Sequence, residues 1–305
     1  MSKYIRLYKS YIKGDVMEVI AVNSGNYSTK AKSKEQEIIF RTKVQENQDA
    51  TKYVISYGKK VEIGDGEIDI DNLKNNSVAH TLCTLYAISI LHRDSDVFLV
   101  TCLPINQYKN KVVRDAYKES LKGYHEIETE QGIDRFNVKD VIVYMEGAAA
   151  LLSYSDVFKD TIVSVIDVGG YNVNVCQFDK LHLVSGSEDD FDLGSYNLKA
   201  NISHDLNRTF NIHLKEYELN YIIKSPNREQ KEIIDKHCTE FINKLRSKLK
   251  TRGYNLSLNA FLFTGGGSVD LEVYIISRFA NSCVGSVFDT ARGLYELGVK
   301  KCSSV

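Results

Sequence analysis

The chain lacks most of the short motifs that identify metal, redox or membrane proteins from sequence alone. Its 305 residues include no C-x-x-C pair and no H-x-x-x-H spacing, so a zinc site has little support. No apolar run approaches the roughly 20 residues that are needed to cross a bilayer. The six cysteines are scattered over apolar segments, which is typical of buried, reduced thiols. We therefore expect a cytoplasmic protein that does not enter a membrane.

A strong charge of either sign is also absent. The net charge is −1 at pH 7, which argues against a chain that binds nucleic acid through its overall field, although a local basic patch stays open. Residues 1–15 are basic and aromatic but have no long apolar core, so we interpret them as an arm rather than a signal peptide. The composition, 43% hydrophobic and 26% charged, indicates one large or two medium globular domains.

The two commonest nucleotide motifs are missing, yet three turns that contain glycine follow apolar strands. Neither GxxxxGK[ST] nor a full GxGxxG occurs in the chain. The glycines stand at position 25, at 169–170 and at 265–267. A ligand with several phosphates needs backbone N–H groups that point at it from more than one side. Three such turns together favour this kind of ligand over purely structural roles.

The most informative stretch is IVSVIDVGGYNVNV, residues 162–175. An apolar strand ends in Asp167, two glycines follow, and a second apolar alternation begins, which predicts a strand, a tight turn and a second strand. A carboxylate beside open N–H groups suits a phosphate with its metal ion. Taken alone, the stretch is equally well explained as a hairpin with an ordinary turn aspartate.

Two further charged residues are candidates for the same site. Lys30 follows Gly25 by five positions and could reach a phosphate, although a solvated surface lysine is the default interpretation of that spacing. Glu146 stands at a predicted strand-to-helix junction, where active-site residues of α/β proteins tend to lie. It could orient or deprotonate a water molecule, or it could simply be an acid favoured by the helix dipole.

The hydrophobic periodicities alternate between strand and helix along the whole chain. Strands are predicted over 16–22, 37–44, 52–57, 96–101, 138–144, 162–168, 181–185 and 259–263. Helices are predicted over 76–91, 108–122, 195–209, 214–224 and 269–280, with a further long helix after an N-cap at Ser225-Pro226. Segments 64–71 and 187–192 are expected to be loops. The pattern of strand, glycine turn and strand occurs twice, which favours an α/β protein of two lobes with a shared hinge.

Five of these segments, in this order, resemble a known signature. It is the five-part nucleotide signature of the actin/Hsp70/sugar-kinase superfamily. The segments are VNSGNYSTK (22–30), MEGAAA (145–150), IDVGGYNVN (166–174), FTGGGS (263–268) and FDTARGLYELG (288–298).

Within that superfamily, the size of the chain, YGKKVEIGDG (57–66) and VTCLPINQY (100–108) look most like the bacterial actins of plasmid segregation, the ParM/StbA type. This resemblance covers about residues 16 to 300. It implies a two-lobed actin-like α/β fold, a duplicated ribonuclease H-like fold with a nucleotide cleft between the lobes. Lobe I would span 1–160, completed by about 288–305, and lobe II would span 161–287.

Carried over residue by residue, the resemblance implies a binding site for ATP or GTP with Mg²⁺. The first phosphate loop would comprise Gly25, Asn26, Tyr27 and Ser28, with Lys30 on the β-phosphate side. The second would comprise Gly169, Gly170, Tyr171 and Asn172. The nucleoside and α-phosphate would meet Gly265, Gly266, Gly267 and Ser268. Gly194 would touch the ribose and Lys224 would flank the base.

The resemblance also implies the catalytic and metal-binding roles. Glu146 would position the hydrolytic water, and Asp167 would hold Mg²⁺ directly or through water. The first loop usually opens with Asp, whereas this chain has Asn23. Because an amide carries no negative charge, Asn23 would be a weak metal contact, and Mg²⁺ would depend more on Asp167. Tyr171, Asn172, Asn174 and Thr290 also depart from the usual pattern, which puts hydrolysis rate and nucleotide choice in doubt more than the fold.

The function that follows from the resemblance is a polymerising ATPase or GTPase. Its filaments would move plasmid DNA through a small adaptor protein bound to a centromere-like site, so no direct contact with nucleic acid and none with membrane is expected. A small-molecule kinase of the same superfamily is the first alternative, but no unassigned Asp stands out as its base. A nucleotide-binding scaffold with little turnover is the second alternative, and Asn23 makes it possible.

Overall fold

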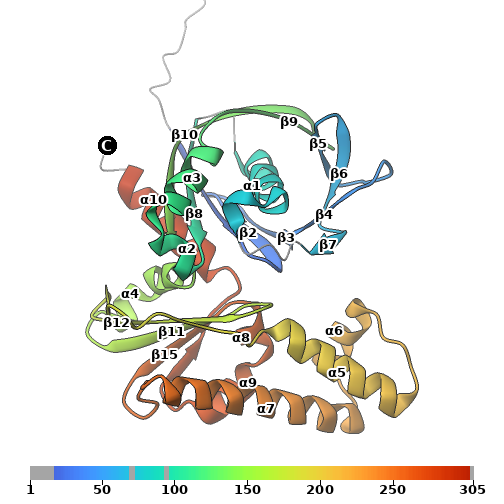
Figure 1. Ribbon diagram of the computed structural model, residues 1–305, viewed down its shortest axis with the longest axis vertical. Helices are drawn as coiled ribbons and strands as arrows, with labels where there is room; N and C mark the ends of the chain where they lie inside the picture. The colour runs from blue at the N-terminus through green and yellow to red at the C-terminus, as the bar shows by residue number, and fades with distance from the viewer. Residues whose placement is uncertain (1–16, 69–72, 93–95, 303–305) are drawn as a thin grey trace, which may run out of the picture.

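The computed structural model describes residues 17–68, 73–92 and 96–302, and the predicted arm over residues 1–15 lies outside these ranges. The described chain forms two α/β lobes, one above the other in Figure 1. Lobe I is built on a ten-stranded sheet and lobe II on a smaller one of six strands. The predicted two-lobed α/β fold is confirmed.

The strands of lobe I occupy the first half of the chain. They are β1 (Glu18–Ser24), β2 (Ser28–Lys32), β3 (Glu37–Arg41), β4 (Lys43–Glu46), β5 (Tyr53–Ser56), β6 (Lys59–Ile63), β7 (Glu67–Ile68), β8 (Val97–Leu103), β9 (Gly123–Thr129) and β10 (Gly132–Met145). Their order in the sheet is β3-β2-β1-β8-β10-β9-β5-β6-β4-β7. β1 and β10 run parallel to β8, and every residue of β8 is buried, as its unbroken apolar run predicts.

The helices of lobe I cover both faces of this sheet. They are η1 (Lys74–Asn76), α1 (Val78–Leu91), α2 (Ile105–Lys109), α3 (Lys111–Leu121) and, from the C-terminal end of the described chain, α10 (Asp289–Cys302). The sheet curves around α1, which is apolar on nearly every face because it is enclosed by the core (Figure 1). α10 packs on the other face of the sheet, against Val19 and Val100.

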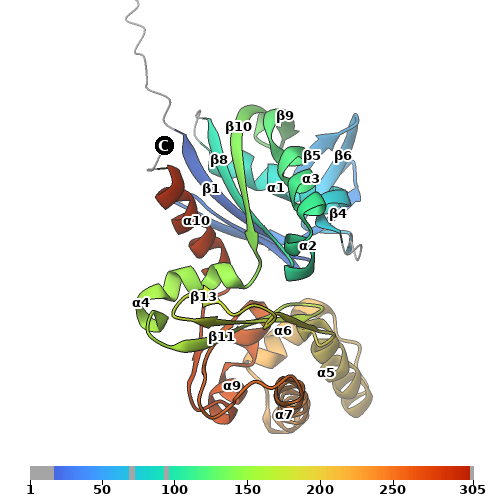
Figure 2. The same cartoon turned by 60° about the vertical axis from the view of Figure 1, so that its left-hand side comes forward.

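Lobe II has a six-stranded sheet with helices on both faces. Its strands are β11 (Ile162–Val168), β12 (Val173–Asp179), β13 (His182–Leu183), β14 (Asp189–Phe191), β15 (Ala260–Thr264) and β16 (Ser282–Val284). Its helices are α5 (Ser195–Phe210), α6 (Glu216–Lys224), α7 (Arg228–Thr251), α8 (Gly266–Asp270) and α9 (Glu272–Arg278). η2 (Ala148–Tyr154) and α4 (Ser155–Phe158) cover the sheet face nearest lobe I, and α5, α7 and α9 cover the other (Figure 2).

Several predicted elements differ from those observed. The helix predicted over 108–122 is two helices, because Asn110 ends α2 and its side chain caps α3. The strand predicted over 37–44 breaks between Arg41 and Lys43. The predicted 187–192 loop contains the short strand β14, which pairs with β12.

Helix starts were also predicted incorrectly at two places. The N-cap of α7 is Asn227, whose side chain accepts from the N–H of Gln230 in a capping box, and not Ser225-Pro226. The helix expected after the predicted strand-to-helix junction at Glu146 begins as a 3₁₀ segment, and the predicted 269–280 helix is divided at Leu271 into α8 and α9. The β9–β10 hairpin was not predicted, because its charged outward residues hide the alternation.

The contact between α10 and η2 supplies a test of the fold. A Cβ atom on Gly293 would collide with the carbonyl oxygen of Ala149. We expect Gly293→Ala to lower the free energy of unfolding by about 1–3 kcal/mol, because it overpacks this contact. Urea unfolding without nucleotide measures the change. Gly266→Ala, whose Cβ would meet no atom within 4 Å, is the matched control, and equal loss in both variants would contradict the close packing.

Candidate functional site

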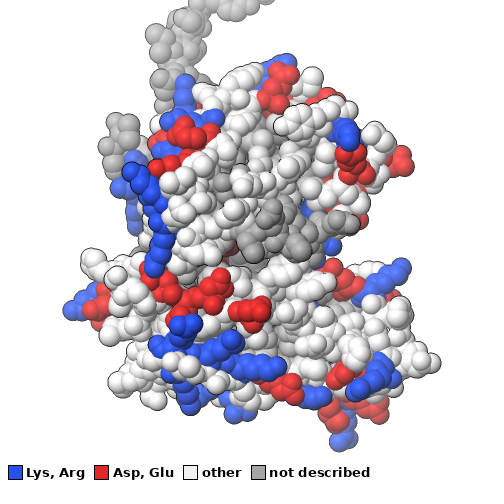
Figure 3. All heavy atoms as spheres, in the orientation of Figure 1, with Lys and Arg blue, Asp and Glu red and all other residues white. Residues whose placement is uncertain are grey.

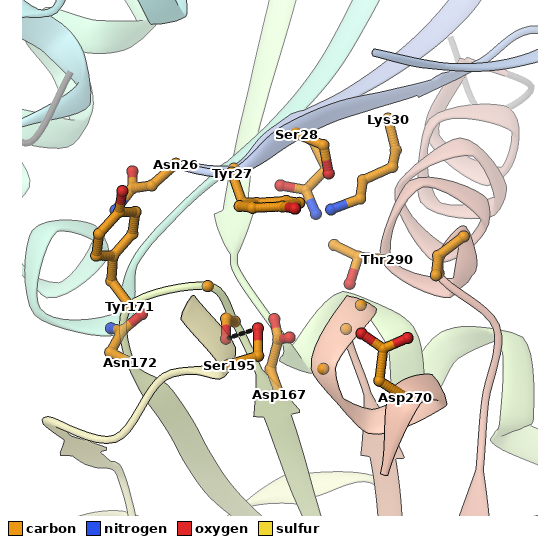
Figure 4. Close-up of a pocket in the computed structure, with 18 of the residues that line it drawn as sticks. Asn26, Tyr27, Ser28, Lys30, Asp167, Tyr171, Asn172, Ser195, Asp270 and Thr290 are labelled. Carbon is orange, nitrogen blue, oxygen red and sulfur yellow. Dashed lines mark hydrogen bonds between the residues drawn. The ribbon is translucent and has the colours of Figure 1, made fainter. Parts of the chain in front are cut away.

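A cavity of about 470 Å³ lies between the lobes, and residues of both lobes line it (Figure 4). Its size is within the usual range for small-molecule sites. Of the residues predicted for the site, those lining it are Asn23, Gly25, Asn26, Tyr27, Ser28, Lys30, Glu146, Asp167, Gly169, Gly170, Tyr171, Asn172, Lys224, Gly265, Gly266 and Gly267. Many lie at or just after the carboxyl ends of strands β1, β10, β11 and β15, the usual place for a ligand in an α/β protein.

The first turn connects β1 to β2 and is held by a buried histidine on α1. The Nδ1 atom of His80 lies 2.8 Å from the Ser24 hydroxyl, and its Nε2 lies 3.1 Å from Oδ1 of Asn26. Since an amide oxygen only accepts, Nε2 is the donor in the second bond. The N–H groups of Asn26 and Tyr27 donate to nothing within the described ranges, so they stay available to a ligand.

The second turn connects β11 to β12 and is anchored by the start of α5. The carbonyl oxygen of Gly169 accepts hydrogen bonds from the backbone N–H and the hydroxyl of Ser195. The carbonyl oxygen of Gly170 accepts a hydrogen bond from the backbone N–H of Tyr196. The N–H groups of Gly170 and Tyr171 make no hydrogen bond in the part of the chain that the structure describes. Like the first turn, this turn therefore presents unused donors to the cavity.

The third turn leaves β15 at Gly265, whose φ of +85° favours glycine. A Cβ atom there would lie 2.7 Å from the carbonyl oxygen of Val168 and would collide with the Asp167 carboxylate. Gly147, with a φ of +78°, approaches the Cβ of Asp167 from lobe I. Two glycines are thus required because the backbone passes close to this one carboxylate on both sides.

Four charged side chains gather at one side of the cavity, and we call this group the charged floor. Lys30, Glu146 and Asp167 line the cavity, and Lys74 is buried behind Glu146 as its ion-pair partner. Lys74 lies 3.1 Å from Glu146, and only 2% of its side chain is exposed. Burial, and then the nearby Glu146, raise the pKa of Asp167 to about 7, against the opposing effect of both lysines. Burial lowers the pKa of Lys30, and the two carboxylates partly offset that effect. When all four groups are ionised, the two positive and two negative charges cancel.

The charged floor is suited to a magnesium ion in the company of phosphates. The Asp167 carboxylate is buried and accepts no hydrogen bond or ion pair from any residue that the structure describes. No group of three or more His, Cys, Asp or Glu side chains is placed to hold a metal in the described ranges. Mg²⁺ commonly uses one or two carboxylates, several waters and substrate phosphates, so one free carboxylate at this position fits.

Asn23 makes a contact that was not predicted. Its side-chain oxygen accepts from the thiol of Cys102 at 3.3 Å, and both side chains are buried. Burial raises the pKa of the Cys102 thiol, so the proton needed for this bond is retained. Asn23 nevertheless lines the cavity together with Asp167, and its role as a weak metal contact stays a prediction.

Two predicted residues do not line the cavity. A Cβ atom on Gly194 would collide with the carbonyl oxygen of Gly170, so this glycine allows α5 to approach the second turn. The hydroxyl of Ser268 is buried and donates to the carbonyl oxygen of Thr264 at 2.5 Å. Their contacts with ribose and nucleoside stay predictions, and the structure gives each a supporting role in a turn.

At one edge of the cavity, a group of three side chains joins the lobes; we call it the clasp. Glu216, at the start of α6, accepts a hydrogen bond from the Arg41 guanidinium at 2.7 Å and another from the Tyr27 hydroxyl, also at 2.7 Å. The Arg41 guanidinium lies 3.5 Å from the centre of the Tyr27 ring. Burial, and then the bond to Glu216, raise the pKa of Tyr27 to about 12. Tyr27 and Arg41 belong to lobe I, so the clasp bridges the cleft.

Sequence reasoning missed several residues of the site. Lys199 of α5 bonds Asn220 of α6 at 3.2 Å and pairs with Asp270 of α8 at 2.8 Å, and all three line the cavity. Lys74 and His80 were missed as well. None of these residues lies in a glycine turn or at a strand end, so only the tertiary fold brings them to the site.

Fold and cavity together describe a two-lobed α/β protein with a cleft between the lobes. Residues 21–148 match the model of a family described as actin-like proteins, N-terminal domain. The predicted resemblance to the actin-like proteins, ParM among them, is confirmed. No match was found among curated protein sequences. In the described ranges, every helix is too short or too polar to span a bilayer.

Solved structures of actin-like proteins match nearly the whole chain. The Alp12 filament structure matches with 23% identity and a TM-score of 0.73, over 93% of this chain and 99% of that one. Ta0583, an archaeal actin homologue in complex with ADP, matches with 16% identity and a TM-score of 0.79, over 93% and 100%. The apo ParM protein of psk41 matches with 15% identity and a TM-score of 0.74, over 94% and 98%.

The clasp predicts how easily the cleft opens. The side chains of Arg41 and Glu216 are 25% and 51% exposed, so their ion pair contributes about 1 kcal/mol or less. We expect Glu216→Gln to speed amide hydrogen exchange in residues 25–32 and 216–224 by about two- to fivefold. Glu240→Gln, at an exposed position on α7, is the charge-matched control. Identical exchange in the Glu216 variant and the wild type would show that the clasp does not hold the lobes.

Proposed function

We propose that this protein is an actin-like ATPase that assembles into filaments when it binds nucleotide, with GTP as the alternative nucleotide. One observation carries the proposal. Two glycine turns, one from each lobe, present unused N–H groups to a single cavity whose floor holds a balanced set of charges. That arrangement suits a chain of phosphates held between two bodies that can move relative to each other.

The residues of the site have distinct tasks in this proposal. The N–H groups of Asn26, Tyr27, Gly170 and Tyr171 bind the β- and γ-phosphates, and Lys30 neutralises part of their charge. Glu146 orients the attacking water. Asp167, with Asn23 as a weak second contact, would hold Mg²⁺, which supplies further charge neutralisation at the phosphates when it is bound. Lys224, Lys199 and Asp270 also line the cavity, and we assign them to the nucleoside end of the ligand.

Assembly would follow from the same geometry. With nucleotide bound, the turns of both lobes contact one ligand, so the angle between the lobes is set by the phosphates. Head-to-tail addition of such subunits is a heterologous contact that does not close, and it builds a filament. The likeness to the Alp12 filament structure supports this step. We also propose the lobe division 1–160 with 288–305, and 161–287.

The biological role that we propose is segregation of plasmid DNA through an adaptor protein. Acidic and basic side chains are interspersed on the face shown in Figure 3. The net charge of −1 likewise supports indirect rather than direct engagement of DNA. The resemblance to ParM proteins is the reason for choosing this role over other uses of a filament.

Light scattering of the purified protein tests assembly. We expect scattering to rise when ATP or GTP is added with Mg²⁺, and Asp167→Ala to abolish the rise or to prevent its later decay. Asp192→Ala, at an exposed position in the same lobe, should behave like the wild type. Scattering that never changes, together with phosphate transfer to a sugar or an acid, would establish a kinase instead. Nucleotide binding with neither assembly nor turnover would establish a scaffold.

The division of labour between Asp167 and Asn23 is a separate prediction. We expect Asp167→Asn to lower Mg²⁺-dependent phosphate release by about 10- to 100-fold, because it removes the unpaired cavity carboxylate that would hold the ion. Asn23→Ala should have a smaller effect, because the amide carries no charge. Phosphate release at saturating nucleotide, measured across a Mg²⁺ titration, separates the two. Equal turnover in Asp167→Asn and the wild type would refute the assignment.

A further inference from the structure

Lys74 is a buried lysine that reaches the site from outside the glycine turns. It belongs to η1, and its backbone N–H donates to the side chain of Gln107 at 3.2 Å. Its Nζ atom lies 3.1 Å from Oε2 of Glu146, where the two side chains are 2% and 12% exposed. A lysine that is almost fully buried normally has a carboxylate partner, because the loss of hydration is costly.

The ion pair of Lys74 is directed at one oxygen of one carboxylate. Within the described ranges, Glu146 is the only ion-pair partner that Lys74 has. Burial tends to lower the pKa of Lys74, but Glu146 together with Cys102 and Tyr117 raises it above its ordinary value, so the ammonium stays charged. The other oxygen of Glu146 faces the first turn, where a Cβ atom on Gly25 would lie 3.8 Å from Oε1.

We propose that Lys74 is a positioning residue for nucleotide hydrolysis, which holds Oε2 of Glu146 so that Oε1 faces the attacking water beside the first turn. This inference rests on the proposed function. In the reaction, the water oxygen forms a bond to the γ-phosphorus, the bond from that phosphorus to the β–γ bridging oxygen breaks, and the nucleoside diphosphate leaves with the electron pair. Oε1 accepts a hydrogen bond from the water, and both water protons end on the released inorganic phosphate.

Lys74 differs from Lys30 in what it can contact. Lys30 lines the cavity and has no ion pair with any described residue, so it is available to the phosphates. Lys74 does not line the cavity, whereas its ion-pair partner Glu146 does. The direct contact of Lys74 with a cavity residue is therefore the one to Glu146, although its charge also acts on Asp167, and a double-mutant cycle with Glu146 separates the two routes.

The experiment measures single-turnover hydrolysis of ATP with Mg²⁺ in four proteins: wild type, Lys74→Met, Glu146→Gln and the double variant. We expect Lys74→Met to slow hydrolysis by about 10- to 100-fold, as is common for groups that orient a functional side chain. Affinity for a fluorescent ATP analogue should change by less than about threefold. If Lys74 positions Glu146, the double variant should hydrolyse ATP no more slowly than Glu146→Gln alone.

Controls separate positioning from stability. Lys34→Met, at an exposed position in lobe I, should hydrolyse ATP like the wild type. Lys74→Arg keeps the charge but displaces the donor atom, so we expect it to fold and to hydrolyse ATP at a rate between those of the wild type and Lys74→Met. If Lys74→Met does not fold, Lys74→Arg is the variant that tests the positioning role. Hydrolysis of ATP by Lys74→Arg at the wild-type rate would then overturn the inference.

The remaining outcomes are also decisive. Wild-type hydrolysis in Lys74→Met, or a further loss in the double variant beyond Glu146→Gln, would overturn the positioning role and leave the proposed ATPase intact. Absence of hydrolysis in the wild-type protein, with either ATP or GTP, would overturn the proposed ATPase and this inference together.

Discussion

The rest of the site depends on how four buried charges are kept in balance at the floor of the cleft. Lys30, Lys74, Glu146 and Asp167 come from four different elements, and each would be costly to bury alone. When all four are ionised their charges cancel, and this offers a physical reason for Asn23. An aspartate at that position would add a third acid to a set already balanced by two lysines, whereas the amide bonds a neutral thiol.

The fold brings these charges together by close backbone approach. Glu146 and Asp167 follow or end buried strands of different sheets, and glycines at 147 and 265 let the backbone pass against Asp167 from both sides. The lobes are further joined by the clasp, whose exposed ion pair is weak enough to open. The resulting cleft has a closely packed floor and an edge held by a weak ion pair, which suits a site that must admit and release a ligand.

The sequence predicts those parts of the site whose residues lie close together in the chain. The three glycine turns, Asp167 and Glu146 all stand at strand ends, and Lys30 follows the first turn, so local pattern finds them. Lys74, His80 and Glu216 lie far from the turns in sequence and reach the site only when the lobes are assembled. The fold shows the same division, because the buried strands were predicted well and the exposed β9–β10 hairpin was not.

Errors of detail have local causes of the same kind. Ser225-Pro226 has the residue types of a helix start. The capping box between Asn227 and Gln230, however, satisfies two backbone N–H donors at the first turn, so α7 has its N-cap two residues after Ser225. The contact of Gly194 with ribose stays a prediction, and its lack of a side chain also allows α5 to pack against the second turn. The capping box and this packing are visible only in three dimensions.

The central claim is that both turns hold the phosphates above the charged floor. A crystal structure with Mg²⁺ and a non-hydrolysable ATP analogue tests it most directly. The account predicts the β- and γ-phosphates within hydrogen-bonding distance of backbone N–H groups in residues 25–28 and 169–172, with Mg²⁺ bound through Asp167. Phosphates that contact only one lobe, or a nucleotide outside this cavity, would contradict it.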